Sequence, residues 1–325
     1  MSLPYDRAMP VGQALRRLSR PSLRVQRIIA ALVILSQGGI AVTGAIVRVT
    51  ASGLGCPTWP QCFPGSFIPV ARSEVPRIHQ AVEFGNRMVT FAVVLTAALA
   101  VLAVIRAHRR REVLVYAWLM PASTVLQAVI GGVTVRTGLL WWTVAIHLLT
   151  SMLMVWLAVL LFVKVGQPDS NGAGVVVDQV AKPLRMLTAL SGLTLAAVLV
   201  AGTLVTAAGP HAGDTSPNRT VPRLRIEITT LVHAHTSLLI AYLALLVGLG
   251  FGLLAVRAPR PVLVRLGVLL VAVFGQAAVG TVQFFTGVPA ALVAIHVAGA
   301  AICTAATAAL WASMRERTQP QPVQS

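Results

Sequence analysis

The chain reads Gln127-Ala-Val-Ile-Gly131, Thr137-Gly138 and Ala145-Ile146-His147 in one segment, and Gln276-Ala-Ala-Val-Gly280, Thr286-Gly287 and Ala294-Ile295-His296 in another. The offset is 149 residues throughout, and small and polar positions match as well as apolar ones. A weaker match at an offset of 158 residues joins residues 42–47 to 200–205, so the first copy is nine residues longer. These matches indicate an internal duplication, with the excess in the loop after the first apolar run.

Both copies consist of long apolar runs, which we place at residues 28–47, 79–105, 113–135, 141–163, 186–208, 229–255, 262–284 and 290–313. Each run has about 20 residues or more, enough for an α-helix to cross about 30 Å of hydrocarbon. Only 11% of the residues are charged, against about 25% in soluble domains, which excludes a soluble enzyme. The sequence therefore predicts an all-α integral membrane protein. Its eight transmembrane helices would form two tandem four-helix bundles, related by a pseudo-two-fold axis along the membrane normal.

Basic residues gather on one side of the predicted helices. The net charge is +17, from 26 Lys and Arg against 9 Asp and Glu. Eighteen of the 26 lie in the two tails and in the second, fourth and sixth connections: Arg7, Arg16, Arg17, Arg20, Arg24, Arg27, Arg106, Arg109, Arg110, Arg111, Lys164, Lys182, Arg185, Arg257, Arg260, Arg265, Arg315 and Arg317. The positive-inside rule places this side, and both termini, in the cytoplasm. The charge thus indicates topology, and we expect no nucleic-acid partner.

The runs and loops divide the chain into five parts. We expect a cytoplasmic basic tail at residues 1–27, an N-terminal bundle at 28–165, a cytoplasmic linker at 166–183, a C-terminal bundle at 184–314 and a cytoplasmic tail at 315–325. Gly, Asn and Ser in the linker are typical of a flexible connection.

Two histidines of the second half lie at one depth. The offset of 149 residues maps His147 onto His296 and Asn86 onto His235, whereas His233 maps onto Phe84. His235 and His296 are each about seven residues inside a run, roughly 10 Å deep. Two imidazoles facing each other across a helical bundle are suited to axial ligation of a haem iron. The alternatives are polar side chains bonded to neighbouring helices, or a zinc or copper site that lacks Cys or carboxylate ligands at this depth.

The first half departs from this symmetry. It has His147, but Asn86 stands where the second histidine is expected, and Asn is a poor haem ligand. Either this site has one firm ligand, or His79, two turns nearer the membrane surface, contributes instead. Weaker ligation suits an exchangeable haem substrate, and the second half would then hold a permanent haem.

Glu83 is the one acidic residue clearly inside an apolar run, one turn before Asn86. A carboxylate within a membrane is expensive, so it is a functional candidate that could relay protons or stabilise a cationic intermediate. The alternative is an i,i+4 ion pair with Arg87, and both roles can coexist. Arg48 and Arg77 lie at the same boundary, where they could bind haem propionates or anchor the helices at the interface.

The first outer loop contains Cys56 and Cys62, separated by Pro-Thr-Trp-Pro-Gln. A disulfide is expected on this oxidising side, either as a structural clip or for thiol–disulfide chemistry.

Together these motifs resemble the haem A synthase family. The residues Thr43-Gly44-Ala45, Arg48-Val-Thr-Ala-Ser-Gly-Leu-Gly-Cys56 and Trp59-Pro-Gln-Cys62 look like the family's first outer loop. Glu83-Phe-Gly-Asn86-Arg87 is similar to its Glu-x-x-His-Arg motif, with Asn in place of His as in the actinobacterial branch, and His147, His235 and His296 match as well. The resemblance covers all eight spans and leaves out the tails and the linker.

The resemblance implies an oxidoreductase of the bacterial cell membrane. Such enzymes oxidise the C8 methyl group of haem O to the formyl group of haem A, by successive hydroxylations, for an aa3-type cytochrome oxidase. The C-terminal half would bind a haem b cofactor through His235 and His296. The N-terminal half would bind haem O near His147, His79, Asn86 and Arg87, with Glu83 as the catalytic residue. In some members the loop cysteines form a disulfide that helps to transfer electrons.

The resemblance also implies partners. These are the substrate haem O, membrane lipid, the protohaem farnesyltransferase that makes haem O and cytochrome oxidase assembly factors, while a homo-oligomer stays open. Two other functions compete. A di-haem b-type membrane electron carrier would have bis-His ligation in both halves. A transporter would need polar or broken helices at the midplane, which the runs lack.

Overall fold

The computed structural model describes residues 20–71, 74–169, 175–216 and 218–318. Over this part the chain forms eight long helices: α2 (Leu23–Val49), α3 (Arg77–Arg106), α4 (Arg111–Arg136), α5 (Trp141–Gly166), α6 (Lys182–Ala208), α7 (Ile228–Ala255), α8 (Arg260–Phe285) and α9 (Ala290–Ser313). Every predicted apolar run lies inside one helix, and each helix is long and apolar enough to cross a membrane. The prediction of an all-α membrane protein with eight spans is confirmed.

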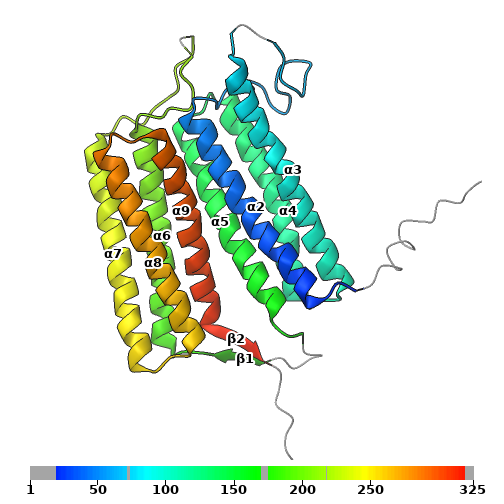
Figure 1. The fold of residues 1–325 in the computed structure, drawn as a ribbon, viewed down its shortest axis with the longest axis vertical. Helices are drawn as coiled ribbons and strands as arrows, with labels where there is room; N and C mark the ends of the chain where they lie inside the picture. Colours follow the sequence, from blue (N-terminus) through cyan, green and yellow to red (C-terminus); the bar gives the residue numbers. More distant parts are fainter. Residues whose placement is uncertain (1–19, 72–73, 170–174, 217, 319–325) are drawn as a thin grey trace, which may run out of the picture.

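The helices form two bundles of four that stand side by side (Figure 1). In the first bundle, α2 and α4 each pack against α3 and α5. In the second bundle, α6 and α8 each pack against α7 and α9, which is the same pattern. The bundles meet where α9 lies against α2 and α5, and where α5 lies against α6. This repeated pattern is what a duplicated four-helix unit is expected to give.

The repeated Thr-Gly pair forms the tight turn between the third and fourth helices of each half. Gly138 has a φ of 63° and Gly287 a φ of 78°, and the residues that follow, Leu139 and Val288, are also left-handed at 61° and 60°. Glycine adopts this region without the steric penalty of a Cβ atom. The two turns therefore start α5 and α9 at equivalent places, which sets His147 and His296 at one height.

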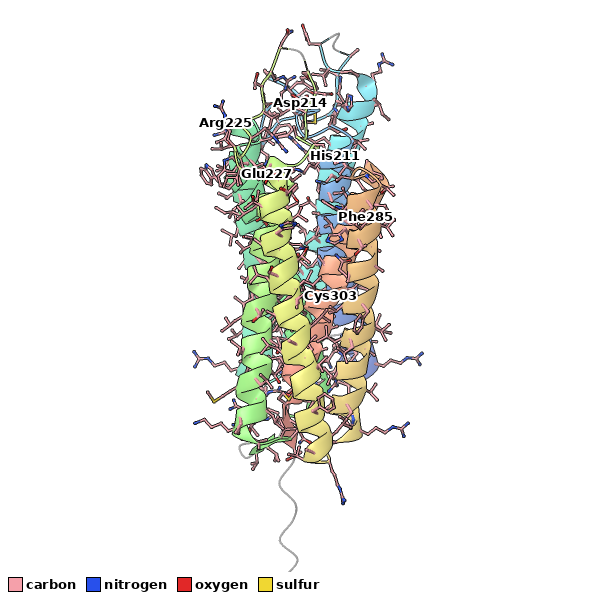
Figure 2. All side chains as sticks on the ribbon, turned by 90° about the vertical axis from the view of Figure 1, so that its left-hand side faces the viewer. His211, Asp214, Arg225, Glu227, Phe285 and Cys303 are labelled. Carbon is pink, nitrogen blue, oxygen red and sulfur yellow. A yellow bond between two sulfur atoms is a disulfide. The ribbon has the colours of Figure 1, made fainter. Side chains whose placement is uncertain are left out.

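The outward surface of the bundles is apolar. Leu35, Phe251 and Val271 are 69%, 71% and 75% exposed, and many other large apolar side chains share this surface. Such a surface would make a soluble protein aggregate, whereas hydrocarbon solvates it. Figure 2 shows the polar outer loops, with His211 and Arg225 labelled, gathered at one end of the helices and Cys303 within the bundle.

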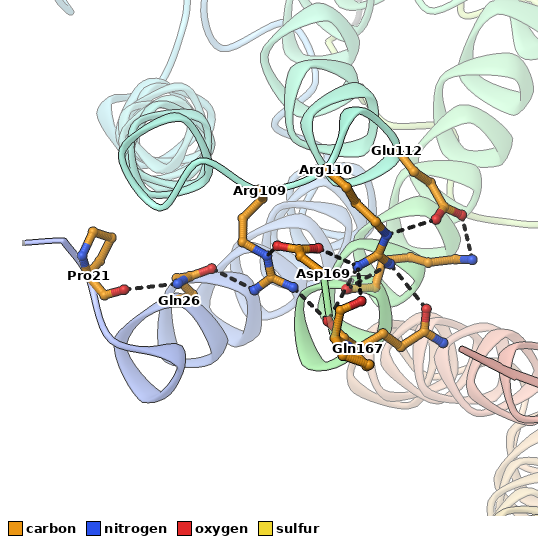
Figure 3. Close-up of polar contacts among 9 residues, drawn as sticks. Pro21, Gln26, Arg109, Arg110, Glu112, Gln167 and Asp169 are labelled. Atoms are coloured by element: carbon orange, nitrogen blue, oxygen red, sulfur yellow. Dashed lines mark hydrogen bonds and ion pairs between the residues drawn. The ribbon is translucent and has the colours of Figure 1, made fainter. Parts of the chain in front are cut away.

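A polar network joins the helices of the first bundle at the end where the basic residues lie (Figure 3). Arg109, between α3 and α4, donates to Oε1 of Gln26 on α2 at 2.9 Å and to the carbonyl of Gln167 after α5 at 2.7 Å. Arg110 donates to Oδ1 of Asp169 at 2.8 Å, and the same carboxylate pairs with Arg109. These arginines therefore join three helices as well as contributing to the basic side of the protein.

The linker, expected to be flexible, contains a short strand that pairs with a strand of the C-terminal tail. β1 (Val175–Asp178) and β2 (Arg315–Thr318) pair as an antiparallel two-stranded sheet. Three consecutive valines favour an extended strand, because β-branched side chains fit a pleated surface. Arg315 and Arg185 both pair with Asp178, which ties this sheet to the start of α6.

Some of the residues used for the topology prediction lie outside the described part of the chain. They are Arg7, Arg16 and Arg17, and the end of the tail at 319–325 lies there too. In the described part, the predicted inner loops lie at one end of the helices and the two long outer loops at the other (Figure 1).

Alkaline phosphatase fusions test the orientation, because the reporter is active only outside the cytoplasm. We expect full activity for fusions after Gly65 in the first outer loop and background activity for fusions after Ala258, between α7 and α8. The reverse pattern would contradict cytoplasmic termini and the positive-inside assignment.

Candidate functional site

His235 on α7 and His296 on α9 face each other inside the second bundle. Their ring centres are 6.5 Å apart and their planes are inclined by 58°. Two imidazoles that bind one metal ion from opposite sides, at about 2 Å from each nitrogen, have ring centres roughly 6 to 6.5 Å apart. The pair thus has the spacing that axial ligation of a single haem iron requires. Within the described ranges no three His, Cys, Asp or Glu side chains form a group that could hold a metal ion.

The tautomer of His235 is set by its neighbour. Its Nδ1 lies 3.0 Å from the carbonyl oxygen of Val198 on α6. A carbonyl only accepts hydrogen bonds, so Nδ1 carries the proton and the neutral ring keeps a free lone pair on Nε2. This arrangement is usual for histidines that bind a metal through Nε2. By contrast, Nδ1 of His296 is shielded from solvent and has no hydrogen-bond partner among the described residues.

A glycine on the neighbouring helix makes room for each of the three deep histidines. A Cβ atom built on Gly202 would lie 3.2 Å from Cε1 of His235, and one on Gly280 would lie 2.9 Å from Cε1 of His296. In the first half, the Gly131 position is 3.3 Å from Cε1 of His147. The repeated Gly131 and Gly280 are therefore explained by close packing against imidazole rings.

The glutamine of each repeat binds the backbone of the histidine on the following helix. Nε2 of Gln276 donates to the carbonyl of His296 at 2.7 Å, and Nε2 of Gln127 donates to the carbonyl of His147 at 3.3 Å. Because Gln and Gly are four residues apart, they lie on one helix face. One face of the third helix in each half thus holds the backbone and the ring of the following histidine.

The first half has no counterpart of the histidine ring pair within the described part of the chain. Oδ1 of Asn86 accepts a hydrogen bond of 2.6 Å from Oγ1 of Thr43 on α2. A Cβ atom built on Gly44, the equivalent of Gly202, would meet no described atom within 4 Å, so this glycine does not pack against a ring as Gly202 does. Nδ1 of His147 is buried and without a partner in the described residues, as in His296.

His79 lies apart from His147. It is at the outer end of α3, and its Nδ1 shares a hydrogen bond of 3.0 Å with Oγ of Ser52 in the first outer loop. The carbonyl of His79 lies against Gly55, where a Cβ atom would approach to 2.2 Å. The structure therefore brings His79 together with the loop and does not pair it with another imidazole in the described part.

The ion pair between Glu83 and Arg87 is present and holds the outer loop. Oε1 of Glu83 is 2.8 Å from Nη2 of Arg87, and Oε2 accepts a hydrogen bond of 3.0 Å from the amide of Cys56. Arg87 also donates to the carbonyls of Cys56 and Thr58, each at 3.0 Å, and to that of Gln61 at 3.2 Å. The pair thus fixes the backbone of the loop on α3. Glu83 itself is only 5% exposed.

Cys56 and Cys62 form a disulfide, and both are fully buried. The loop that they close carries the carbonyls that Arg87 binds. The disulfide and the Glu83–Arg87 ion pair therefore hold the same loop.

Most of the chain matches one known protein family. The family described as COX15-CtaA, "Cytochrome oxidase assembly protein", matches residues 27–308. The chain belongs to the COX15-CtaA family.

Three individual proteins are similar to this chain over a shorter stretch. The chain is 34% identical over 101 residues to the heme A synthase of Geobacillus kaustophilus (strain HTA426), which is 31% of this chain and 30% of that protein. It is 33% identical over 101 residues to the heme A synthase of Geobacillus thermodenitrificans, with the same two shares. The heme A synthase of Lysinibacillus sphaericus (strain C3-41) is 30% identical over 116 residues, 35% of this chain and 36% of that protein. The matches thus span about a third of these relatives.

The sequence singles out the deep histidines, Asn86, the Glu83–Arg87 pair and the cysteines as candidates, but it does not reveal most of the other groups that contact them. Thr43 and Ser52 carry no signal beyond their polarity. The glycines and glutamines could have been found from the sequence, because Gln127, Gly131 and their equivalents recur at the offset of 149 residues.

The glycine contacts make a testable prediction. Gly280→Ala forces the His296 ring to shift, since its Cβ would lie 2.9 Å from Cε1. We expect haem binding to weaken about tenfold to 100-fold, the usual effect of disturbing a group that orients a metal ligand. Gly275→Ala on the same helix is the control, because its Cβ meets no described atom within 4 Å. Equal haem occupancy of the two purified variants, measured from the Soret band, would contradict the assignment.

Proposed function

We propose that this chain is a haem A synthase, an oxidoreductase that oxidises the C8 methyl group of haem O to a formyl group by successive hydroxylations. The observation that carries the proposal is the contrast between equivalent sites of one duplicated fold. One half has a histidine pair at metal-binding distance, and the other has His147 with Asn86 in place of the second histidine. A cofactor that stays and a substrate that leaves need such a difference. Family membership and relatives named heme A synthase support the proposal.

The C-terminal bundle, residues 184–314, is proposed to hold haem b through His235 and His296. The ring spacing of 6.5 Å and the Nδ1–H tautomer of His235 fit such a group. Haem, when bound there, supplies one-electron redox chemistry in an apolar environment. The protein's own contribution is to fix both rings, through the Val198 carbonyl on one side and through Gln276 and Gly280 on the other.

The N-terminal bundle, residues 28–165, is proposed to bind haem O, with His147 as the firm ligand. Asn86 is held by Thr43 and lies one turn from Glu83. We assign Glu83 the role of holding or accepting a proton beside the substrate. Its carboxylate is kept in place by the Cys56 amide and by Arg87, so its position is fixed before substrate arrives. His79, bonded to Ser52, is assigned to the entrance of this site.

The remaining assignments concern the surroundings of the site. The Cys56–Cys62 disulfide is proposed to pass reducing equivalents from the outer face, or to clip the loop. Haem O is insoluble, so lateral hand-over in the bilayer from a protohaem farnesyltransferase is proposed, with the product serving an aa3-type cytochrome oxidase and its assembly factors. The protein is assigned to the bacterial cell membrane with both termini cytoplasmic, and a homo-oligomer stays open.

Conversion is tested in a host that makes haem O but no haem A. We expect haem A in the extracted haems, separated by chromatography, when the chain is expressed. His296→Ala, which removes one proposed ligand of haem b, is the matched control and should give none. A well-expressed, haem-loaded sample without haem A above the empty-vector level would refute the enzyme and leave the electron carrier as the alternative.

Glu83→Gln separates catalysis from folding. The Gln side chain keeps the shape and can still accept from the Cys56 amide, but it has no charge and no proton to exchange. We expect haem b binding to persist and haem A formation to fall about 100-fold or more, the size of a general acid–base effect. Glu74→Gln, an exposed residue of the same outer loop, is the control. Undiminished conversion by the Glu83 variant would remove this residue from the mechanism.

A further inference from the structure

Two arginines converge on one carbonyl oxygen at the outer end of α6. Arg48, near the end of α2, donates through Nη2 to the carbonyl of Thr206 at 3.1 Å. Arg223, in the second outer loop, donates through Nη2 to the same oxygen at 3.3 Å. Arg223 also donates to the carbonyls of Gly209 and His211. Two guanidinium groups therefore lie side by side where the two halves of the protein meet.

These two cations have no carboxylate partner among the described residues. The described acidic residues of the second outer loop are engaged elsewhere. Asp214 accepts from Ser216 and is 3.8 Å from Arg219, and Glu227 caps α7 by accepting from the amide of Thr230. The end of α6 contributes only about half a negative charge. Two positive charges thus face a small negative counterpart.

The two guanidinium groups are also partly removed from water. Nε of Arg48 is shielded from solvent and has no partner in the described part of the chain. Burial lowers the pKa of the Arg223 guanidinium, as expected for a cation removed from water. One arginine is enough to cap the C-terminus of α6. Arg223 alone already donates to the carbonyls of Thr206, Gly209 and His211, at and just beyond the end of this helix. A second cation adds repulsion without a further cap.

The arginine pair lies one turn from the candidate haem site. Thr206 is four residues beyond Gly202, the glycine against which the His235 ring packs, so it lies about 6 Å farther toward the outer surface. Thr206 is also the repeat equivalent of Arg48, at the offset of 158 residues. The second half therefore lacks its own arginine at this place, and the first half provides one from α2.

We propose that Arg48 and Arg223 form an anion site for the propionate carboxylates of the haem held by His235 and His296. Guanidinium groups match carboxylates in charge and in planar geometry. The inference rests on the proposed haem at the histidine pair and adds that the N-terminal bundle completes the cofactor site of the C-terminal bundle. It predicts that haem binding in the second half depends on a residue of the first.

The test compares haem b with its dimethyl ester, in which both propionates are uncharged. The full chain is produced in haem-deficient cells, purified in detergent and titrated with each compound. We expect the unmodified protein to bind haem b at least about tenfold more tightly than the ester, since charge-assisted hydrogen bonds are the strong ones. Arg48→Gln with Arg223→Gln should abolish this preference, whereas Arg48→Lys with Arg223→Lys should keep part of it.

Arg225→Gln is the matched control, because this exposed arginine of the same loop has no role in the site (Figure 2). It should keep the full preference for the acid. Equal affinity of the unmodified protein for haem b and its ester would overturn the inference and leave the histidine site intact, and this result needs no variant to fold. Failure to bind either compound would overturn the proposed haem site and the inference together.

Discussion

The hydrocarbon of the membrane imposes the constraint on which the rest of this structure depends: polar groups inside it must find partners within the chain. The outward surface meets this constraint by being apolar, and the helices meet it through their own backbone hydrogen bonds. Several polar side chains that persist at depth have a partner among the described residues, whereas Nδ1 of His147 and Nδ1 of His296 have none. His235 is held by a carbonyl, Asn86 by Thr43, and Glu83 by an amide and Arg87. These hydrogen-bond partners therefore fix the positions of these three side chains.

The two halves share the same four-helix arrangement but differ in the side chains at the equivalent sites. The Gln-x-x-x-Gly face and the left-handed Thr-Gly turn set His147 and His296 in the same way. Opposite them, one copy has an imidazole and the other an amide engaged with Thr43. The copies are also joined, because α9 packs against α2 and α5, and Arg48 reaches from the first half to a carbonyl of the second. The two candidate sites are thus neighbours in one structure.

The helices and the depth of the histidines were predictable because each rests on a local rule. Length and apolarity predict a span, and a constant offset carries a position from one copy to the other. Contacts between a loop and a helix follow no such rule. Arg87 was foreseen as the partner of Glu83, but not as a donor to the carbonyls of Cys56 and Thr58, because those bonds depend on where the loop folds back. The β1–β2 sheet was missed for a similar reason: its strands are short and far apart in the sequence.

The central claim is that the two halves hold haem differently, one firmly and one exchangeably. Haem stoichiometry measures this directly: the protein is purified from cells that make haem b but cannot make haem O, and haem is quantified per chain together with the ferric low-spin spectrum. The account predicts one haem b per chain with a bis-histidine signature, which persists in His147→Ala and disappears in His235→Ala. Two equally retained haems b per chain, or one that depends on His147 instead of His235, would contradict it.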